Sequence, residues 1–205
     1  MLRANIAVFC SGGGTNLQAL IDAQTAGALH SGRIALVLAS TPEAYALERA
    51  KKAGIPTAVC SWKELDSQAA FEAAIHRALA AHGIHVIVLA GFLSILSEDF
   101  TRWWPGRVLN VHPSLIPAFC GKGMYGLRVH EAALARGVKV TGATVHLVNE
   151  IPDGGPIVAQ KAVEVLPGDT PEILQRRVME QAEWVLLPQA AELLCAQIVK
   201  GEDKQ

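Results

Sequence analysis

Asn110 and His112 are the residues whose types and spacing most clearly suggest chemistry. They lie two positions apart at the end of an apolar run, and Pro113 and Pro117, which cannot continue a strand ladder, follow them. Residues two apart on a strand point to the same side, so we expect the amide and the imidazole to face one site. This pair suits a carbonyl oxygen that becomes an oxyanion. The alternative interpretation is a plain turn stiffened by prolines.

Asp153, which stands before two glycines in the segment 149–155, is the third candidate. In a transfer of an acyl group to an amine, Asn110 would donate a hydrogen bond to the oxyanion and His112 would supply a proton or positive charge. Asp153 would accept the proton of the attacking amine, directly or through water. No serine or cysteine with a paired base is evident, so we expect direct transfer without an acyl-enzyme. Spacing alone does not establish that the three residues converge.

A glycine-rich segment, residues 11–16, separates an apolar run at 5–10 from a helical pattern carried by Leu17, Leu20 and Ile21. A strand, a glycine turn and a helix in this order present backbone N–H groups to a phosphate. The residues expected to bind it are Gly13, Gly14, Thr15 and Asn16. The segment matches neither a Walker loop nor the GxGxxG pattern, and the alternative is a tight turn without a ligand.

The elements that must position these residues alternate along the chain. Apolar runs predict strands at 5–10, 34–38, 56–60, 84–90, 107–112, 141–148 and 157–165, the last antiparallel to the one before it. Helical patterns predict helices from Leu17, from Thr41 to about Ala53, from a cap at Asp66 or Ser67 to His82, at 97–103, at 126–136, and from Thr170 nearly to the end with a kink or break at Pro188. This order predicts a three-layer α/β fold with a Rossmann-like, mostly parallel sheet, antiparallel C-terminal strands and a long C-terminal helix.

Length and composition favour one globular domain, residues 1–205. Hydrophobic residues make up 51% of the chain, charged residues 18%, and the formal net charge is −1. No basic run indicates nucleic-acid binding, no apolar run could span a membrane, and the chain begins directly on its first strand without a signal sequence. Cys10, Cys60, Cys120 and Cys195 lie far apart without a CxxC pair, which fits reduced thiols in the cytoplasm and no metal site.

Four segments together resemble a known family. They are SGGGTNLQALIDA at 11–23, LAGFLSILS at 89–97, NVHPSLIP at 110–117 and DGGPIVAQ at 153–160. In order and spacing they are similar to the folate-dependent formyltransferases, and the first segment points to the branch that formylates phosphoribosylglycinamide in purine synthesis. The resemblance covers nearly the whole chain.

The resemblance implies 10-formyltetrahydrofolate as cosubstrate, 5'-phosphoribosylglycinamide as substrate, and no metal. It implies a phosphate-binding N-terminal half, a folate-binding and catalytic C-terminal half, and a monomer or homodimer. By resemblance, Asn110, His112 and Asp153 are catalytic, and Gly14, Thr15 and Asn16 match the phosphate loop. The remaining residues expected to line the substrate and folate sites are Gly91, Phe92, Leu93, Leu96, His146 and, with a one-residue shift in its helix, Glu183, which would hold ribose hydroxyls.

The chain departs from the family pattern in two places. Ser94 stands where many members carry a longer polar side chain, often Arg, so the folate-tail contacts of relatives are not carried over. The loop after Pro117 is longer than in many members, and the glycines at 121, 123 and 126 predict that 118–126 is mobile; an ordinary connection is the alternative.

Other folate-dependent enzymes and a protein without chemistry are competing interpretations. A methionyl-tRNA formyltransferase would usually add a C-terminal domain, and a formyltetrahydrofolate hydrolase would usually add an N-terminal one. A non-catalytic nucleotide-binding protein would keep the glycine loop, but the presence of Asn110, His112 and Asp153 gives that interpretation no support.

Overall fold

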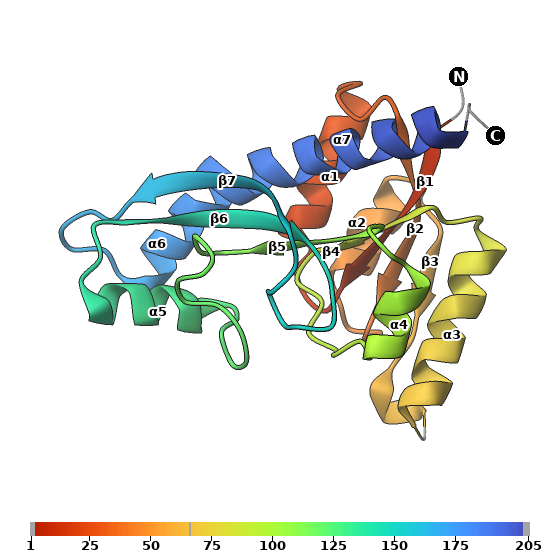
Figure 1. Cartoon of the computed structure of the whole chain (residues 1–205), viewed down its shortest axis with the longest axis horizontal. Coiled ribbons are helices and arrows are strands. Elements are labelled where there is room, and N and C mark those ends of the chain that lie inside the picture. The colour runs from red at the N-terminus through yellow and green to blue at the C-terminus, as the bar shows by residue number, and fades with distance from the viewer. Residues whose placement is uncertain (1–2, 66, 203–205) are drawn as a thin grey trace.

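The computed structural model describes residues 3–65 and 67–202, so the outermost residues of the expected domain and Asp66, one of the two expected caps, lie outside the described residues. One seven-stranded sheet runs through the molecule in the order β3-β2-β1-β4-β5-β6-β7 (Figure 1). The strands are β1 (Ala4–Cys10), β2 (Gly32–Ala39), β3 (Thr57–Val59), β4 (Val86–Leu89), β5 (Val108–His112), β6 (Val140–Leu147) and β7 (Ile157–Glu164).

The first five strands are parallel, whereas β6 is antiparallel to β5 and to β7. Every expected strand is present with both ends within two residues of the prediction. The parallel pairs carry near-continuous apolar runs because helices cover both faces of the sheet. The prediction of a mostly parallel sheet with antiparallel C-terminal strands is therefore confirmed.

The helices form layers on the two faces of the sheet (Figure 1). They are α1 (Thr15–Thr25), α2 (Ala46–Lys52), α3 (Gln68–Ala81), α4 (Glu98–Trp103), α5 (Leu127–Arg136), α6 (Pro171–Val178) and α7 (Trp184–Glu202), with a short 3-10 turn at Trp62–Glu64 and a π-helical turn at Met179–Glu183. Ser67 caps α3 by accepting a hydrogen bond from the backbone N–H of Ala70.

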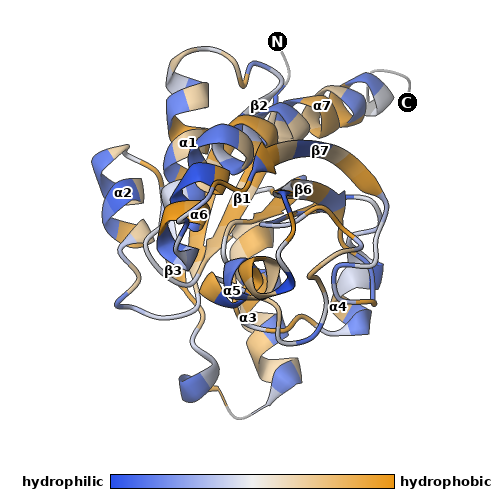
Figure 2. Ribbon diagram, turned by 90° about the vertical axis from the view of Figure 1, so that its left-hand side faces the viewer, coloured by the Kyte–Doolittle hydropathy of each residue, from blue (hydrophilic) through white to orange (hydrophobic). Residues whose placement is uncertain are grey.

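Alternate residues of β1 pack into two separate hydrophobic cores. Ile6 and Val8 pack with residues of α1 and α7 on one face, while Ala7 and Phe9 pack with residues of α3 and α4 on the other. Figure 2 shows the same pattern, with apolar colour concentrated on the central strands and polar colour on the outer helix faces. The two cores fix the central strands from both sides and thereby hold the loops at their carboxyl ends.

The structure contradicts the predicted start of one helix and one of the two effects predicted for Pro188. The helix expected from Thr41 begins only at Ala46, because the segment before it turns, with Ala44 N–H bonded to the Thr41 carbonyl, and the Ala46 N–H donates to the Gly12 carbonyl at 3.1 Å. Of the kink or break predicted at Pro188, the break is contradicted, because Pro188 lies inside the continuous helix α7. The irregularity comes earlier, at the π turn, and Leu187 and Ala190 hold α7 in the core on both sides of the proline.

Candidate active site

A cavity of about 440 Å³ opens at the carboxyl ends of the parallel strands. The glycine segment that follows β1, the turn that follows β4 and the end of β5 all meet there, as expected for an open α/β sheet. Its lining residues are Gly12, Gly13, Gly14, Thr15, Asn16, Ala90, Gly91, Phe92, Leu93, Asn110, Val111, His112, Pro113, Met124, Tyr125, Gly126, Asp153, Gln175, Met179 and Glu183.

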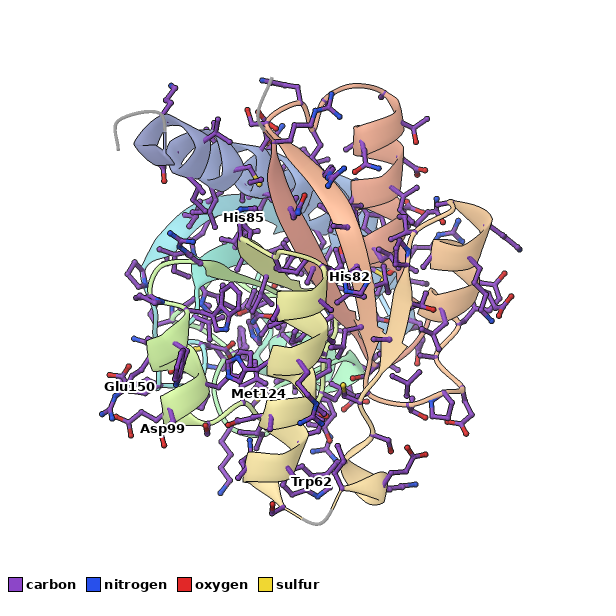
Figure 3. All side chains as sticks on the ribbon, turned by 90° about the vertical axis from the view of Figure 1, so that its right-hand side faces the viewer. Trp62, His82, His85, Asp99, Met124 and Glu150 are labelled. Carbon is purple, nitrogen blue, oxygen red and sulfur yellow. The ribbon has the colours of Figure 1, made fainter. Side chains whose placement is uncertain are left out.

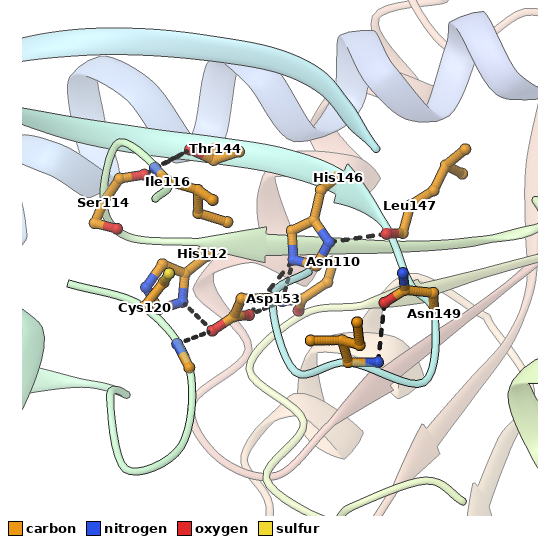
Figure 4. Close-up of polar contacts among 12 residues, drawn as sticks. Asn110, His112, Ser114, Ile116, Cys120, Thr144, His146, Leu147, Asn149 and Asp153 are labelled. Atoms are coloured by element: carbon orange, nitrogen blue, oxygen red, sulfur yellow. Dashed lines mark hydrogen bonds and ion pairs between the residues drawn. The ribbon is translucent and has the colours of Figure 1, made fainter. Parts of the chain in front are cut away.

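Asn110, His112 and Asp153 converge at one end of this cavity (Figure 4). The Nδ1 atom of His112 lies 3.5 Å from Oδ2 of Asp153, and Nδ2 of Asn110 lies 3.5 Å from its Oδ1. The Nε2 atom of His112 contacts the Phe119 carbonyl at 2.9 Å, and because a carbonyl only accepts, this nitrogen carries a proton. The sequence alone left this convergence open.

The turn that carries Asp153 is held by close backbone packing. Asp153 has a positive φ of 55°, which is uncommon for a residue with a side chain. At Gly155 a Cβ atom would lie 1.8 Å from the Leu147 carbonyl oxygen at the end of β6, so only glycine fits. This contact brings the 149–155 segment back over the end of β5 and directs Asp153 toward His112.

Asp153 is favoured in its ionised form. Burial raises its pKa, but hydrogen bonds from His146 and the Gly121 amide, and the charges of His112 and His146, together lower the pKa below its ordinary value of 3.8. The Gly121 N–H donates to Oδ2 at 2.8 Å. A carboxylate ionised in this way can accept a proton from a reacting group.

His146 lies behind the pair and does not line the cavity. It is buried on β6 opposite Asn110, and its Nδ1 contacts the Leu147 carbonyl at 2.9 Å, so Nδ1 carries the proton. Its Nε2 lies 3.1 Å from Nδ2 of Asn110 and 3.5 Å from Oδ1 of Asp153, so a neutral ring accepts from the amide and a protonated ring donates to the carboxylate. His146 thus supports the site from the adjacent strand and does not face a ligand.

The glycine segment lines the cavity from the end of β1, two strands away from β5 in the sheet. Helix α1 follows it with Gly14 as the N-cap and without a capping side chain, so its first N–H groups are available to a ligand. No lysine or arginine is found among the described residues that line the cavity. Arg49 approaches from outside, with Nε bonded to the Gly13 carbonyl at 2.8 Å, and it was not predicted from the sequence.

Glu183 lines the cavity next to the glycine segment. It is 5% exposed, and its Oε2 accepts a 2.7 Å hydrogen bond from Nδ2 of Asn16. Burial raises the pKa of Glu183 although this hydrogen bond lowers it. Glu183 is the last residue of the π turn that leads into α7.

Three of the four expected residues after β4, Gly91, Phe92 and Leu93, line the cavity, whereas Leu96 does not. Leu96, like Phe92, packs against the core on the α3 face. A hydrogen bond from Leu93 N–H to the Ser11 hydroxyl, 2.8 Å, ties this segment to the glycine segment.

The lining residues that were not predicted from the sequence include Met124, Tyr125, Gln175 and Met179. Gln175 and Met179 lie eight and four positions before Glu183, a spacing that could have indicated one helix face. Met124 and Tyr125 belong to the 118–126 loop, whose sequence carries no signal for these positions.

His82 and His85, labelled with Met124 in Figure 3, lie at the other end of the sheet, where His85 Nδ1 accepts from Asn5 N–H near the start of β1.

Within the described ranges 3–65 and 67–202, no three His, Cys, Asp or Glu side chains are grouped to hold a metal. A search of the same residues for a helix that could cross a membrane found none.

Comparisons with known proteins agree with the geometry. The formyl transferase family model matches residues 4–190. The chain is 41% identical over 183 residues to phosphoribosylglycinamide formyltransferase of Haemophilus influenzae, covering 89% of this chain and 83% of that one. A solved structure of glycinamide ribonucleotide transformylase 1 from Symbiobacterium toebii superposes with a TM-score of 0.88 at 40% identity, covering 95% of this chain and 89% of that one.

Longer relatives match as well. The chain is 43% identical over 202 residues, 98% of its length, to the trifunctional purine biosynthetic protein adenosine-3 of Bos taurus, but it spans only 19% of that protein.

Proposed function

The chain belongs to the formyl transferase family, and from this premise we propose that it transfers a formyl group from 10-formyltetrahydrofolate to the amine of 5'-phosphoribosylglycinamide in purine biosynthesis. One observation carries the proposal. Asn110, His112 and Asp153 line the cavity beside β5, the glycine segment lines it two strands away at the end of β1, and Glu183 is hydrogen-bonded to Asn16 of that segment. A substrate with an amine at one end and a phosphate at the other matches this arrangement of groups.

The phosphate end relies on backbone groups. Because no lysine or arginine is among the described lining residues, the N–H groups of Gly13 to Asn16 and the N-terminus of α1 are the groups that can hold a phosphate. Arg49 lies outside the cavity and adds positive charge near the Gly13 carbonyl.

The ribose fits beside Asn16 and Glu183. The Glu183 carboxylate can accept hydrogen bonds from hydroxyl groups, and Oδ1 of Asn16 is buried without a partner among the described residues. A buried acceptor without a donor costs about 1–3 kcal/mol, so a ligand hydroxyl placed there would recover that cost.

The formyl oxygen becomes negative when the amine attacks, and Asn110 and protonated His112 would stabilise it. Nδ2 of Asn110 has two hydrogens, one directed at His146 at 3.1 Å and one at Asp153 at 3.5 Å. The longer contact is the weaker one, so the formyl oxygen would replace Asp153 as the partner of that hydrogen. His146 would meanwhile hold the amide with its NH₂ group toward the site.

Asp153 would take the proton from the attacking amine, directly or through water, and the folate nitrogen would gain a proton before it leaves. The lowered pKa keeps Asp153 ionised at neutral pH, as an acceptor must be. Gly91, Phe92 and Leu93 offer an open backbone and an apolar wall for the flat folate ring on the side of β4.

An absorbance assay with 10-formyltetrahydrofolate tests the proposal. We expect deformylation of the folate that depends on added phosphoribosylglycinamide. Deformylation without any amine would indicate a hydrolase, a requirement for methionyl-tRNA would indicate the tRNA-formylating branch, and binding without turnover would indicate a non-catalytic protein.

We further propose that residues 1–205 act as a single domain, in the cytoplasm, as a monomer or homodimer. The single sheet that links both halves supports the first point. The four free cysteines support a reducing compartment.

A further inference from the structure

The loop at 118–126 contacts the proposed catalytic pair through its backbone. The Phe119 carbonyl accepts from Nε2 of His112 at 2.9 Å, and the Gly121 N–H donates to Oδ2 of Asp153 at 2.8 Å. Phe119 has a positive φ of 49°, so the turn is bent to present both groups to the pair. Each member of the pair thus has one backbone partner from the same short segment.

These contacts do not fill the cavity. None of the residues 118–121 lines it, whereas Met124, Tyr125 and Gly126, from the second half of the same loop, do. Lys122 and Gly123, between the two halves, are exposed. The loop therefore has two parts, one that holds the pair from the side and one that forms cavity wall.

We propose that Gly121 is a positioning residue for the reaction, whose amide, together with the Phe119 carbonyl, holds Asp153 and His112 in the orientation that the transfer uses. This inference rests on the proposed function. It assigns the first half of the loop to the chemistry and the second half to the substrate.

The Gly121 amide acts on a carboxylate that several groups face. His112 reaches it from β5 at 3.5 Å, His146 from β6 at 3.5 Å, and the Cys120 thiol lies beside it in the loop. Burial raises the pKa of Asp153, and the Gly121 hydrogen bond is one of the contacts that reverse this effect. Without that bond, burial is opposed less, and the pKa of Asp153 should rise.

The Phe119 carbonyl acts on the imidazole. Because a carbonyl only accepts, the Phe119 contact requires a proton on Nε2 of His112. In a neutral ring with that proton, Nδ1 has none and its lone pair faces Asp153. Only the cation, with a proton on each nitrogen, donates to both partners. The cation is the form that stabilises an oxyanion. The two backbone contacts therefore fix Nε2 of His112 as a donor and give the Asp153 carboxylate a donor from the same segment.

The opposite interpretation is a lock, in which the same contacts hold the pair away from the substrate. A lock predicts that loosening the segment raises turnover. A positioning role predicts that loosening lowers turnover and moves the acidic limb of the pH profile.

Gly121 and Gly123 provide a matched pair of variants. Their φ angles are +87° and +86°, and a Cβ atom at either position would meet nothing within 4 Å. Gly121→Ala and Gly123→Ala therefore impose similar backbone strain, but only the first disturbs the amide that binds Asp153. Gly121→Asn serves as a milder variant, because asparagine tolerates positive φ better than alanine does.

The experiment measures kcat against pH and, without substrate, the pKa of Asp153 by carboxyl ¹³C NMR. We expect Gly121→Ala to lower kcat roughly tenfold, the loss expected for one hydrogen bond to a charged group, and to raise the pKa. Gly121→Asn should show a smaller change of the same sign, and Gly123→Ala should match the wild type.

Equal pKa values of Asp153 in Gly121→Ala and Gly123→Ala would overturn the inference, as would a higher kcat in Gly121→Ala. A wild-type chain that does not formylate phosphoribosylglycinamide would refute the proposed function instead. Because the NMR titration needs no substrate, the two failures are distinguishable.

Discussion

The side-chain amide of Asn16 donates a 2.7 Å hydrogen bond to the carboxylate of Glu183, a residue 167 positions further along the chain. Both side chains are buried, at 8% and 5% exposure. The bond joins the first turn of α1 to the end of the π turn at Met179–Glu183. Two segments far apart in the sequence therefore form one wall of the cavity.

This buried carboxyl should make stability depend on pH. Burial raises the pKa of Glu183 above its ordinary value of 4.5, so the fold favours the protonated form, and this stabilisation is lost as the pH rises from about 4.5 through the raised pKa. Glu183→Gln keeps an acceptor for Asn16 but does not titrate. We expect the Tm of the wild type to fall relative to that of Glu183→Gln between about pH 4.5 and pH 7. Parallel Tm curves would show that Glu183 does not titrate differently in the folded protein.

The glycine segment can be tested without disturbing the fold. A Cβ atom at Gly13 would meet nothing within 4 Å, so Gly13→Val should fold normally while its side chain displaces a phosphate from the backbone amides. We expect the KM for phosphoribosylglycinamide to rise at least about tenfold, with a much smaller change in kcat. At Gly14 a Cβ atom would lie 2.8 Å from that of Ala46, so Gly14→Val should also lose stability. An unchanged KM in a folded Gly13→Val variant would show that the phosphate does not bind at this segment.

His130 on α5 should reduce stability in acid. It is fully buried, neither ring nitrogen has a partner among the described residues, and burial and the nearby positive charge of His112 lower its pKa to about 4. The folded state therefore resists protonation, and stability is lost as the pH falls from about 6.5 toward 4.

Two substitutions separate the causes. His130→Leu should raise the free energy of unfolding by about 1–3 kcal/mol at pH 7 and flatten its decline in acid. His130→Asn should flatten the decline without the gain, since a polar group stays buried. Denaturant titrations at pH 7 and pH 5 measure both effects, and an undiminished acid decline in His130→Leu would assign it to other groups.

The parts of the fold that follow from local pattern were predictable. Buried parallel strands are continuous apolar runs, and Asn110 and His112 could be placed at a strand end because Pro113 stops the ladder. The glycine segment could be placed before α1 because strand, glycines and helical periodicity follow one another directly.

Features set by contacts between distant segments were not predictable. Thr41 and Pro42 carry helix-start signals, but the Ala46 N–H is bound to Gly12, and this contact decides where α2 begins. The π turn differs from α-helix by one hydrogen-bond register, which no single residue signals. His146 shares a strand face with Thr144, yet only the pairing of β6 with β5 puts it behind Asn110.

The central claim is that Asn110, His112 and Asp153 act on one tetrahedral intermediate. Removal of an oxyanion donor typically lowers turnover by about 10²–10³, so Asn110→Ala and His112→Ala should each fall in that range. Asp153→Asn, which removes the proton acceptor, should lose roughly 10²–10⁴. All three variants should keep the wild-type fold by circular dichroism.

The most direct test is kcat of the double variant His112→Ala/Asp153→Asn beside the two single variants, at saturating substrates. His112 and Asp153 face each other at 3.5 Å and act on the same step. Removing one of them therefore reduces the contribution that the other makes to turnover. We predict that the double variant loses clearly less than the product of the two single losses. A loss equal to that product, or full turnover in folded Asp153→Asn, would contradict the account.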